Sequence, residues 1–216
     1  MNQQVLVQAI SILELSEQEA EPLYALLDEA KREEILSRKD EKDRLRGLVG
    51  YLLASLASKK ELPVHFERGT HGKPYLPGGP QFSISHSGPY VVCAISEEEV
   101  GVDLQRHTEV DFLPIAERFY QKEEIRLIKE SEDPKRAFFD IWAKKESILK
   151  CSGVGLSRDF EKIPALQEEV RSGKERYYPT LMPFLDGYSL ALCGKKQTLA
   201  RFSWVGLGTI LDLIKK

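Results

Sequence analysis

The chain has 216 residues, and its 31 Lys and Arg against 34 Asp and Glu give a net charge of −3 with histidine neutral. Hydrophobic residues make up 42% and charged residues 30%, which is typical of a soluble globular protein and excludes a disordered or collagen-like chain. The slightly acidic total also argues against a general nucleic-acid-binding protein, since such proteins normally carry a clear basic excess.

Cysteines and apolar stretches indicate the compartment. The three cysteines, Cys93, Cys151 and Cys193, form no C-x-x-C pair, which favours reduced thiols in a cytoplasmic protein. No positive charge stands among the first four residues, so we expect no signal peptide. The longest stretch without charged residues, Pro74 to Ser96, contains four prolines, and we therefore expect no membrane-spanning helix.

The first part of the chain predicts a strand followed by helices. Alternating apolar residues predict a strand within Val5–Leu15, and a capping-box pattern at Ser16 predicts a helix start. The stretch Lys31–Arg46 is dense in both charge signs, which indicates a solvated face or loop. From Leu45 onward the apolar spacing is that of an amphipathic helix, which we expect Pro63 to end.

The middle of the chain predicts a group of strands. After several Gly and Pro turn signals, Phe82–His86 and Tyr90–Ile95 are typical of two strands joined by a turn. Val100–Gln105 predicts a further strand. The region Pro114–Glu130 is helical in pattern, as one helix or two.

The last part repeats this order of a long helix and strands. Asp133 and Pro134 are typical of a helix start, Gly153 of its end, and strands are expected over Tyr177–Leu181 and Tyr188–Cys193. This order favours an α+β fold over a regular βαβ alternation. Because no Gly-, Ser- or Pro-rich linker separates them, we expect two α+β halves, residues 1–99 and 100–216, packed as one compact body.

Two segments carry carboxylates in informative positions. On the strand GVDLQ, Asp103 and Gln105 share one face, although a half-exposed strand would look the same. On the helix segment WAKKESILK, Glu146 and Lys150 are four residues apart, as in an ordinary surface pair. Lys145 lies within the apolar stripe of that helix, so its ammonium must reach the surface or meet an anion.

The segment FSISHSG offers no hydrolase site. Ser85 and His86 are adjacent on a strand and face opposite sides, and the chain has no G-x-S-x-G elbow. His86 is consistent with a hydrogen-bonded structural residue or with a ligand contact.

Combined, these residues suggest a metal and phosphate site. Asp103 and Glu146 have the carboxylates with which proteins hold one Mg²⁺ beside a phosphate-bearing substrate. Positively charged or donor side chains for several phosphates are available elsewhere. These are Arg44, His86, Lys145 and Lys150. The chain has no P-loop and no G-x-G-x-x-G pattern, so a standard nucleotide-binding loop is excluded.

The ordered set HGKPYLP, FSISHSG, GVDLQ and WAKKESILK resembles the larger, monomeric 4′-phosphopantetheinyl transferases, the type that activates non-ribosomal peptide synthetases. The resemblance covers about residues 44–155. It implies two pseudo-symmetric α+β halves with coenzyme A between them. It also implies transfer of the phosphopantetheinyl arm of coenzyme A to a serine of an apo acyl or peptidyl carrier protein, with release of adenosine 3′,5′-bisphosphate.

The resemblance also implies site residues. Asp103 and Glu146 would bind Mg²⁺, Glu146 would help deprotonate the serine, and Lys150 would steady the pyrophosphate. The coenzyme A contacts would come from the basic and strand residues of these motifs together with the adenine-side segment at Gly72. They are Arg44, Lys73, Pro74, Ser85, His86 and Lys150, and Lys31 is a further candidate.

One residue departs from the family pattern. Many members have Glu where this chain has Gln105, whose amide oxygen can ligate Mg²⁺ or hold a bound water without adding charge. We therefore expect a site with two carboxylates. The catalytic roles fall to Glu146, Lys150 and His86, and the metal site to Asp103, Gln105 and Glu146.

The expected partners are coenzyme A and a carrier protein, with no nucleic acid and no membrane, and the pseudo-twofold chain is expected to act as a monomer. Because carrier proteins are usually acidic near the accepting serine, a basic docking face is one reading of the cations in the region 114–130, and a solvated mixed face is the other. They are Arg118, Lys122, Arg126 and Lys129. The alternative function is that of a non-catalytic, coenzyme A-binding regulatory protein.

Overall fold

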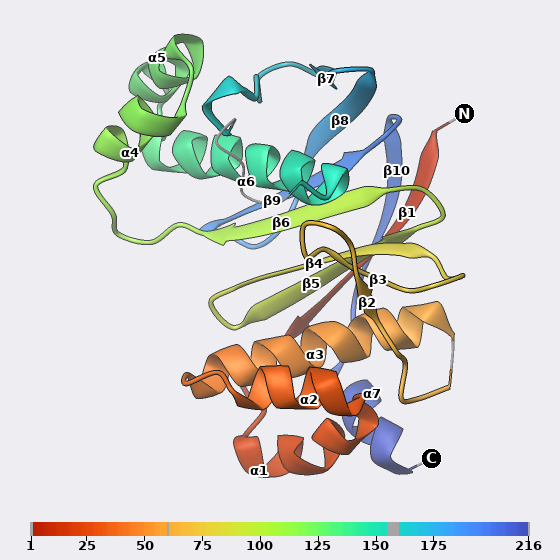
Figure 1. Ribbon diagram of the computed structural model, residues 1–216. Coiled ribbons are helices and arrows are strands. Elements are labelled where there is room, and N and C mark those ends of the chain that lie inside the picture. The colour runs from red at the N-terminus through yellow and green to blue at the C-terminus, as the bar shows by residue number, and fades with distance from the viewer. Residues whose placement is uncertain (1, 60, 155–159, 216) are drawn as a thin grey trace.

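The computed structural model describes residues 2–59, 61–154 and 160–215. Two four-stranded sheets lie face to face, and each carries a long helix on its outer side (Figure 1). The order is therefore helix, sheet, sheet, helix. The two helices are α3 (Glu41–Ser58) on the first sheet and α6 (Pro134–Ser152) on the second.

The first sheet has the strand order β10-β1-β5-β4. Its strands are β1 (Gln3–Ser11), β4 (Gln81–Ser87), β5 (Tyr90–Ser96) and β10 (Thr198–Trp204). The elements around it are α1 (Glu17–Ala20), the 3₁₀ helix η1 (Glu21–Leu26), α2 (Glu29–Leu36), the short pair β2 (Glu67–Arg68) and β3 (Pro74–Tyr75), α7 (Leu207–Leu211) and the 3₁₀ helix η3 (Asp212–Lys215).

The second sheet has the strand order β6-β9-β8-β7. Its strands are β6 (Val100–Arg106), β7 (Val170–Ser172), β8 (Glu175–Met182) and β9 (Tyr188–Gly194). Beside α6 lie α4 (Phe112–Phe119), α5 (Lys122–Glu130) and the 3₁₀ helix η2 (Phe160–Lys162).

Apolar residues that alternate along the strands form the layer between the two sheets. Val5 and Val92 of the first sheet meet Val102, Leu104 and Leu192 of the second in one buried cluster. The opposite faces of the same strands pack on the helices, because successive side chains of a strand point to opposite sides. This arrangement confirms the predicted α+β fold with two halves in one body.

The C-terminal segment lies with the first half. β10 pairs with β1 in parallel, with Val5 opposite Ala200, and Ile210 of α7 joins the buried cluster under α3. The predicted boundary between residues 99 and 100 stays a prediction. The sheet of the first half also contains β10, a strand from the predicted second half.

The charged stretch Lys31–Arg46 is helical, so the loop is the wrong alternative, and most of its residues form a solvated face, which was the other one. It contains most of α2 and the start of α3, capped by the side chains of Asp28 and Asp40. The helical period was hard to recognise because Ile35 is the buried apolar residue of α2, and the rest of that short helix is charged except for Ala30 and Leu36. α3 also ends before Pro63, at Lys59 in a left-handed conformation with φ 55°.

The region Pro114–Glu130 forms two helices, α4 and α5, separated by an extended Tyr120 and capped at Gln121. Its four cations therefore do not share one helix face. The other expected elements are confirmed: the first strand, the capping box at Ser16, β4, β5, β6, β8, β9 and both ends of α6. Among the described residues, none of the helices combines the length and the apolar character that crossing a bilayer requires.

Candidate functional site

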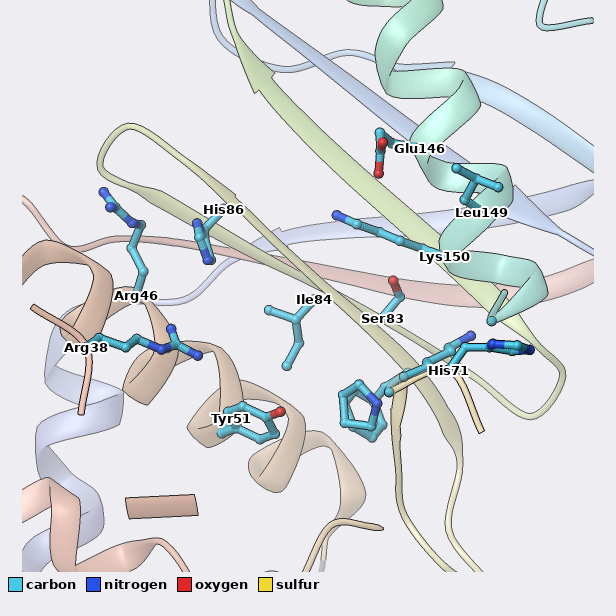
Figure 2. A pocket seen from close by; sticks show the side chains of 16 residues that line it. Arg38, Arg46, Tyr51, His71, Ser83, Ile84, His86, Glu146, Leu149 and Lys150 are labelled. Carbon is cyan, nitrogen blue, oxygen red and sulfur yellow. The ribbon is translucent and has the colours of Figure 1, made fainter. Parts of the chain in front are cut away.

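A cavity of about 360 Å³ opens where α3, β4 and α6 come together, so both halves contribute to its wall (Figure 2). Its lining combines arginines, histidines and a lysine with Glu146 and apolar side chains. The lining residues are Arg38, Arg46, Gly47, Tyr51, His71, Gly72, Lys73, Pro74, Phe82, Ser83, Ile84, His86, Glu146, Leu149, Lys150 and Gly153.

A close contact between β6 and α6 forms the polar side of the cavity. A side chain at Gly101 would place its Cβ 2.0 Å from the carbonyl oxygen of Ser147 and 2.4 Å from the nitrogen of Cys151. Only glycine allows the strand to approach the helix this closely. Because of this approach, Asp103 of β6 and Lys150 of α6 meet at 2.6 Å.

Asp103 is 2% exposed and fully engaged by its neighbours. Its Oδ1 accepts hydrogen bonds from Lys150 Nζ (2.6 Å) and Ser85 Oγ (2.9 Å), and its Oδ2 accepts one from Gln105 Nε2 (2.8 Å). Three donors that converge on a buried carboxylate satisfy it and fix its orientation.

Glu146 lies beside this group and faces the cavity (Figure 2). Burial, and then the negative charge of Asp103, raise its pKa to about 7, whereas Lys150 acts in the opposite direction. The negative charge of Asp103 therefore acts on Glu146, whereas their joint role as metal ligands stays a prediction. Among the described residues, no three His, Cys, Asp or Glu side chains are grouped closely enough to hold a metal ion.

His86 lies on the opposite wall with Arg46 and Arg38 (Figure 2). Although His86 is exposed, the loss of water around its ring in the cavity wall lowers its pKa to about 4, and the positive charges of Arg46 and then Lys150 lower it further. Arg46 is paired with Asp43 and donates to the Gly88 carbonyl (3.0 Å), so it is held in place at the rim.

Arg44 does not line this cavity, and the geometry speaks against its predicted ligand contact. Its Nε pairs with Glu17 Oε1 at 2.8 Å, and it donates to the carbonyl of Arg38 at 3.1 Å. Residues two apart on a helix are separated by roughly 200°, so Arg44 and Arg46 point to opposite sides of α3. Gly47 and Tyr51, which also line the cavity, lie three and seven residues after Arg44, so helix spacing alone did not single out Arg46.

Lys145 is also absent from the cavity, which corrects its predicted role as a charge for a phosphate ligand. It is 0% exposed and pairs with Glu124 at 2.8 Å. Its ammonium also donates to the carbonyls of Phe160 (3.2 Å) and Ile163 (2.7 Å). The expectation that a lysine in the apolar stripe must meet an anion is confirmed.

Of the remaining predicted contacts, some line the cavity and some do not. Pro74 and the stem of Lys73 line it, but the ammonium of Lys73 donates to the Val100 carbonyl at 3.0 Å, and burial lowers its pKa. Ser85 is buried behind the wall, and Ser83 lines the cavity in its place. Lys31 is 5% exposed, with its ammonium on the Tyr51 hydroxyl (2.9 Å).

The arrangement suits a ligand with several phosphates. Cations and hydrogen-bond donors lie along the wall of α3 and β4, and Glu146 and Lys150 of α6 lie along the other wall. The other two predicted metal ligands, Asp103 and Gln105, do not line the cavity; Asp103 is buried and bonded to Lys150 and Gln105. Cations and donors are groups that suit phosphate oxygens, and carboxylate oxygens suit a divalent cation.

Comparisons with known proteins agree with this chemistry. Residues 99–193 match the sequence model of the 4′-phosphopantetheinyl transferase superfamily. The chain is 33% identical over 195 residues to the 4′-phosphopantetheinyl transferase Sfp of Bacillus subtilis (strain 168), which covers 83% of this chain and 87% of that protein. It is 30% identical over 198 residues to the 4′-phosphopantetheinyl transferase ffp of Bacillus subtilis. That match covers 84% of this chain and 88% of the relative. A shorter match, with 37% identity over 122 residues, is to the 4′-phosphopantetheinyl transferase gsp of Aneurinibacillus migulanus. It covers 53% of this chain and 51% of the relative.

Proposed function

Because this chain belongs to the 4′-phosphopantetheinyl transferase superfamily, we propose that it transfers the 4′-phosphopantetheinyl arm of coenzyme A to a serine of an apo acyl or peptidyl carrier protein. The observation that carries the proposal is the cavity between the halves, with cations and hydrogen-bond donors on one wall, Glu146 and Lys150 on the other, and Asp103 buried against Lys150. Coenzyme A, which carries a diphosphate and a 3′-phosphate, matches this distribution of charge.

The donor set beside Lys150 fits a magnesium ion. Asp103, Glu146 and Gln105 have carboxylate and amide oxygens, which are the ligands that Mg²⁺ takes in proteins. Asp103 is buried and Glu146 half-buried, and the negative charge of Asp103 helps to raise the pKa of Glu146, a repulsion that a cation bound between them would relieve. When bound, Mg²⁺ would neutralise negative charge on the diphosphate of coenzyme A.

In the proposed reaction, the serine oxygen of the carrier attacks the phosphorus that bears the phosphopantetheinyl arm. The bond between this phosphorus and the bridging oxygen breaks, and that oxygen leaves with adenosine 3′,5′-bisphosphate. The serine proton passes to Glu146, directly or through a water. Lys150 stabilises the charge that grows on the leaving group, which is where fixed cations lower the barrier most.

The other wall holds and orients the nucleotide. Arg46 and His86 are assigned to the phosphates, and Pro74 with the Lys73 stem to the adenine side. The pKa of His86, about 4, keeps its ring neutral near pH 7 in the free protein, so it contributes a hydrogen-bond donor while Arg46 contributes charge. Such contacts bind substrate and transition state alike and lower KM.

The cavity also bears on the oligomeric state. Both of its walls come from one chain, so we propose that the protein acts as a pseudo-twofold monomer, with residues 1–99 and 100–216 as its halves.

The cysteines support a cytoplasmic location. All three, Cys93, Cys151 and Cys193, are buried free thiols, which suits a reducing environment.

Mass spectrometry of the carrier tests the proposal. The protein is incubated with coenzyme A, Mg²⁺ and an apo carrier, and the carrier is weighed. We expect a gain equal to one phosphopantetheinyl group, which is lost with EDTA and strongly slowed in Glu146→Ala. Binding of coenzyme A without modification of any carrier of the acyl or peptidyl type would instead support the non-catalytic alternative.

A further inference from the structure

Strands β4 and β6 belong to different sheets, yet they are joined by a regular set of hydrogen bonds. Three serines at alternate positions of β4 accept, through their hydroxyl oxygens, the backbone N–H groups of three alternate residues of β6. The pairs are Val102 N to Ser83 Oγ (3.1 Å), Leu104 N to Ser85 Oγ (3.1 Å) and Arg106 N to Ser87 Oγ (2.9 Å). We call this set the serine seam.

The seam fixes β6 relative to β4. β6 pairs with β9 along its other side, so the N–H groups at this side need partners from elsewhere. Because alternate side chains of a strand lie on one face, serines two residues apart on β4 match N–H groups two residues apart on β6. The seam thereby sets the position of Asp103 on one strand relative to His86 on the other.

Ser85 differs from the other two serines in what else its hydroxyl contacts. It donates its one proton to Asp103 Oδ1 at 2.9 Å, and its oxygen accepts from Leu104 N at 3.1 Å and Lys150 Nζ at 2.8 Å. A hydroxyl has one donor and two acceptor sites, so all its bonding capacity is used. The side chain is 5% exposed, which shields these bonds from water.

From this geometry we propose that Ser85 is a positioning residue of the metal site. It ties Asp103 Oδ1 to the backbone of β6 and to Lys150, so the carboxylate holds one orientation before a cation arrives. The inference rests on the proposed function, because it takes Asp103 as a metal ligand. Partners behind a ligating carboxylate typically change metal affinity by 10–100-fold when they are removed.

This role replaces the coenzyme A contact that the sequence suggested for Ser85. Ser83 and His86, which lie on either side of Ser85 in β4, line the cavity. The Ser85 hydroxyl instead forms its hydrogen bonds with Asp103, Lys150 and the Leu104 backbone nitrogen. A ligand contact would require breaking at least one of these bonds.

The test compares Ser85→Ala with the matched variant Ser87→Ala in the full-length protein. Each removes one hydroxyl of the seam, but Ser85 is the one bonded to Asp103. Binding of Mn²⁺ as a probe is measured by electron paramagnetic resonance without substrates. The Mg²⁺ concentration for half-maximal rate and the KM for coenzyme A are measured beside it.

For Ser85→Ala we expect Mn²⁺ binding and the Mg²⁺ requirement to weaken by about tenfold or more, with KM for coenzyme A changed less than about twofold at saturating Mg²⁺. Ser87→Ala should shift metal affinity less than about twofold, and Ser85→Thr, which restores the hydroxyl, should recover most of it. If Ser85→Ala does not fold, Ser85→Cys, with a weak thiol donor, is measured in its place under the same expectation.

Three results with the variants would overturn the inference. Unchanged Mn²⁺ affinity in Ser85→Ala is one, and an equal loss in Ser87→Ala is another, because it would mean that the seam acts only on stability. The third is a rise in KM for coenzyme A at constant metal affinity, which would make Ser85 a ligand contact. If the wild-type protein itself neither binds Mn²⁺ nor requires Mg²⁺, the proposed metal site fails, and the inference with it.

Discussion

Helix α6 carries two lysine–carboxylate pairs that differ in their surroundings. Lys145 meets Glu124 at 2.8 Å, with side chains 0% and 1% exposed. Lys150 meets Asp103 at 2.6 Å, with side chains 30% and 3% exposed. The lysines lie five residues apart, yet one is enclosed in the core of the second half, and the other reaches the cavity between the halves.

The enclosed pair has its bonding capacity filled. Lys145 donates to Glu124 and to two carbonyls, of Phe160 and Ile163. Glu124 in turn accepts from the backbone nitrogens of Gln121 and Ala165. This network ties α5 and the segment after residue 159 to α6. Buried charges satisfied in this way hold a fold together and leave nothing for a ligand.

The open pair differs in what faces it. Lys150 lines the cavity beside Glu146, whose carboxylate has its pKa raised by burial and by Asp103. Unbalanced charge next to an open cavity is what a charged ligand or cation can neutralise. We therefore expect the Lys145–Glu124 pair to matter for stability and the Lys150–Asp103 pair for activity, and the following variants test this difference.

The largest expected effect is on stability, in the enclosed pair. Lys145→Met leaves the Glu124 carboxylate buried without its partner, which should lower the free energy of unfolding by about 3–5 kcal/mol. Urea denaturation followed by circular dichroism measures this. Replacing both residues, as in Lys145→Met with Glu124→Leu, should recover much of the loss. A single variant as stable as the wild type would contradict the structural role.

Next comes the open pair, where activity should suffer more than stability. Lys150→Gln removes the cation opposite the leaving group, and we expect the rate of carrier modification to fall on the order of 10²-fold. The Lys150 side chain is 30% exposed, so water and the new amide can both donate to Asp103, which also keeps its bonds to Ser85 and Gln105. The free energy of unfolding should therefore fall by at most about 2 kcal/mol. A rate loss that merely follows the loss of folded protein would remove the distinction between the pairs.

A matched pair of arginines on α3 tests the other wall. Arg46→Ala should raise KM for coenzyme A about tenfold, since a charge-assisted contact to phosphate is typically worth about 1.5–3 kcal/mol. Arg44→Ala, which loses an ion pair with Glu17 outside the cavity, should change KM less than about twofold. Steady-state kinetics at saturating carrier compares them, and equal effects would mean that the cavity does not hold the phosphates as assigned.

The smallest expected change is a gain at Gln105. Gln105→Glu adds a third carboxylate to the proposed metal site, so the Mg²⁺ concentration for half-maximal rate should fall by about two- to fivefold. Titration of the rate with Mg²⁺ measures this shift. An unchanged titration would place Gln105 outside the metal site and confine it to its hydrogen bond with Asp103.

Much of this molecule could be predicted from local patterns. The caps at Ser16 and Asp133, the αL end at Gly153 and the strands β4, β5 and β6 depend on neighbours along the chain, and they were predicted correctly. That Asp103 and Gln105 share one face of β6 was also predictable from local sequence, because side chains two residues apart on a strand point to the same side.

Other properties depend on residues far apart in the sequence, and only the tertiary structure decided them. The partner of Lys145 comes from α5 and that of Lys150 from β6, while Glu17 of α1 pairs with Arg44 outside the cavity that Arg46 lines. Burial and the cost of an unpaired charge set these outcomes, and both are defined only after distant segments have packed together. Residue types and spacing therefore sufficed for the family and its motifs, whereas packing assigned each charge to the core or to the cavity.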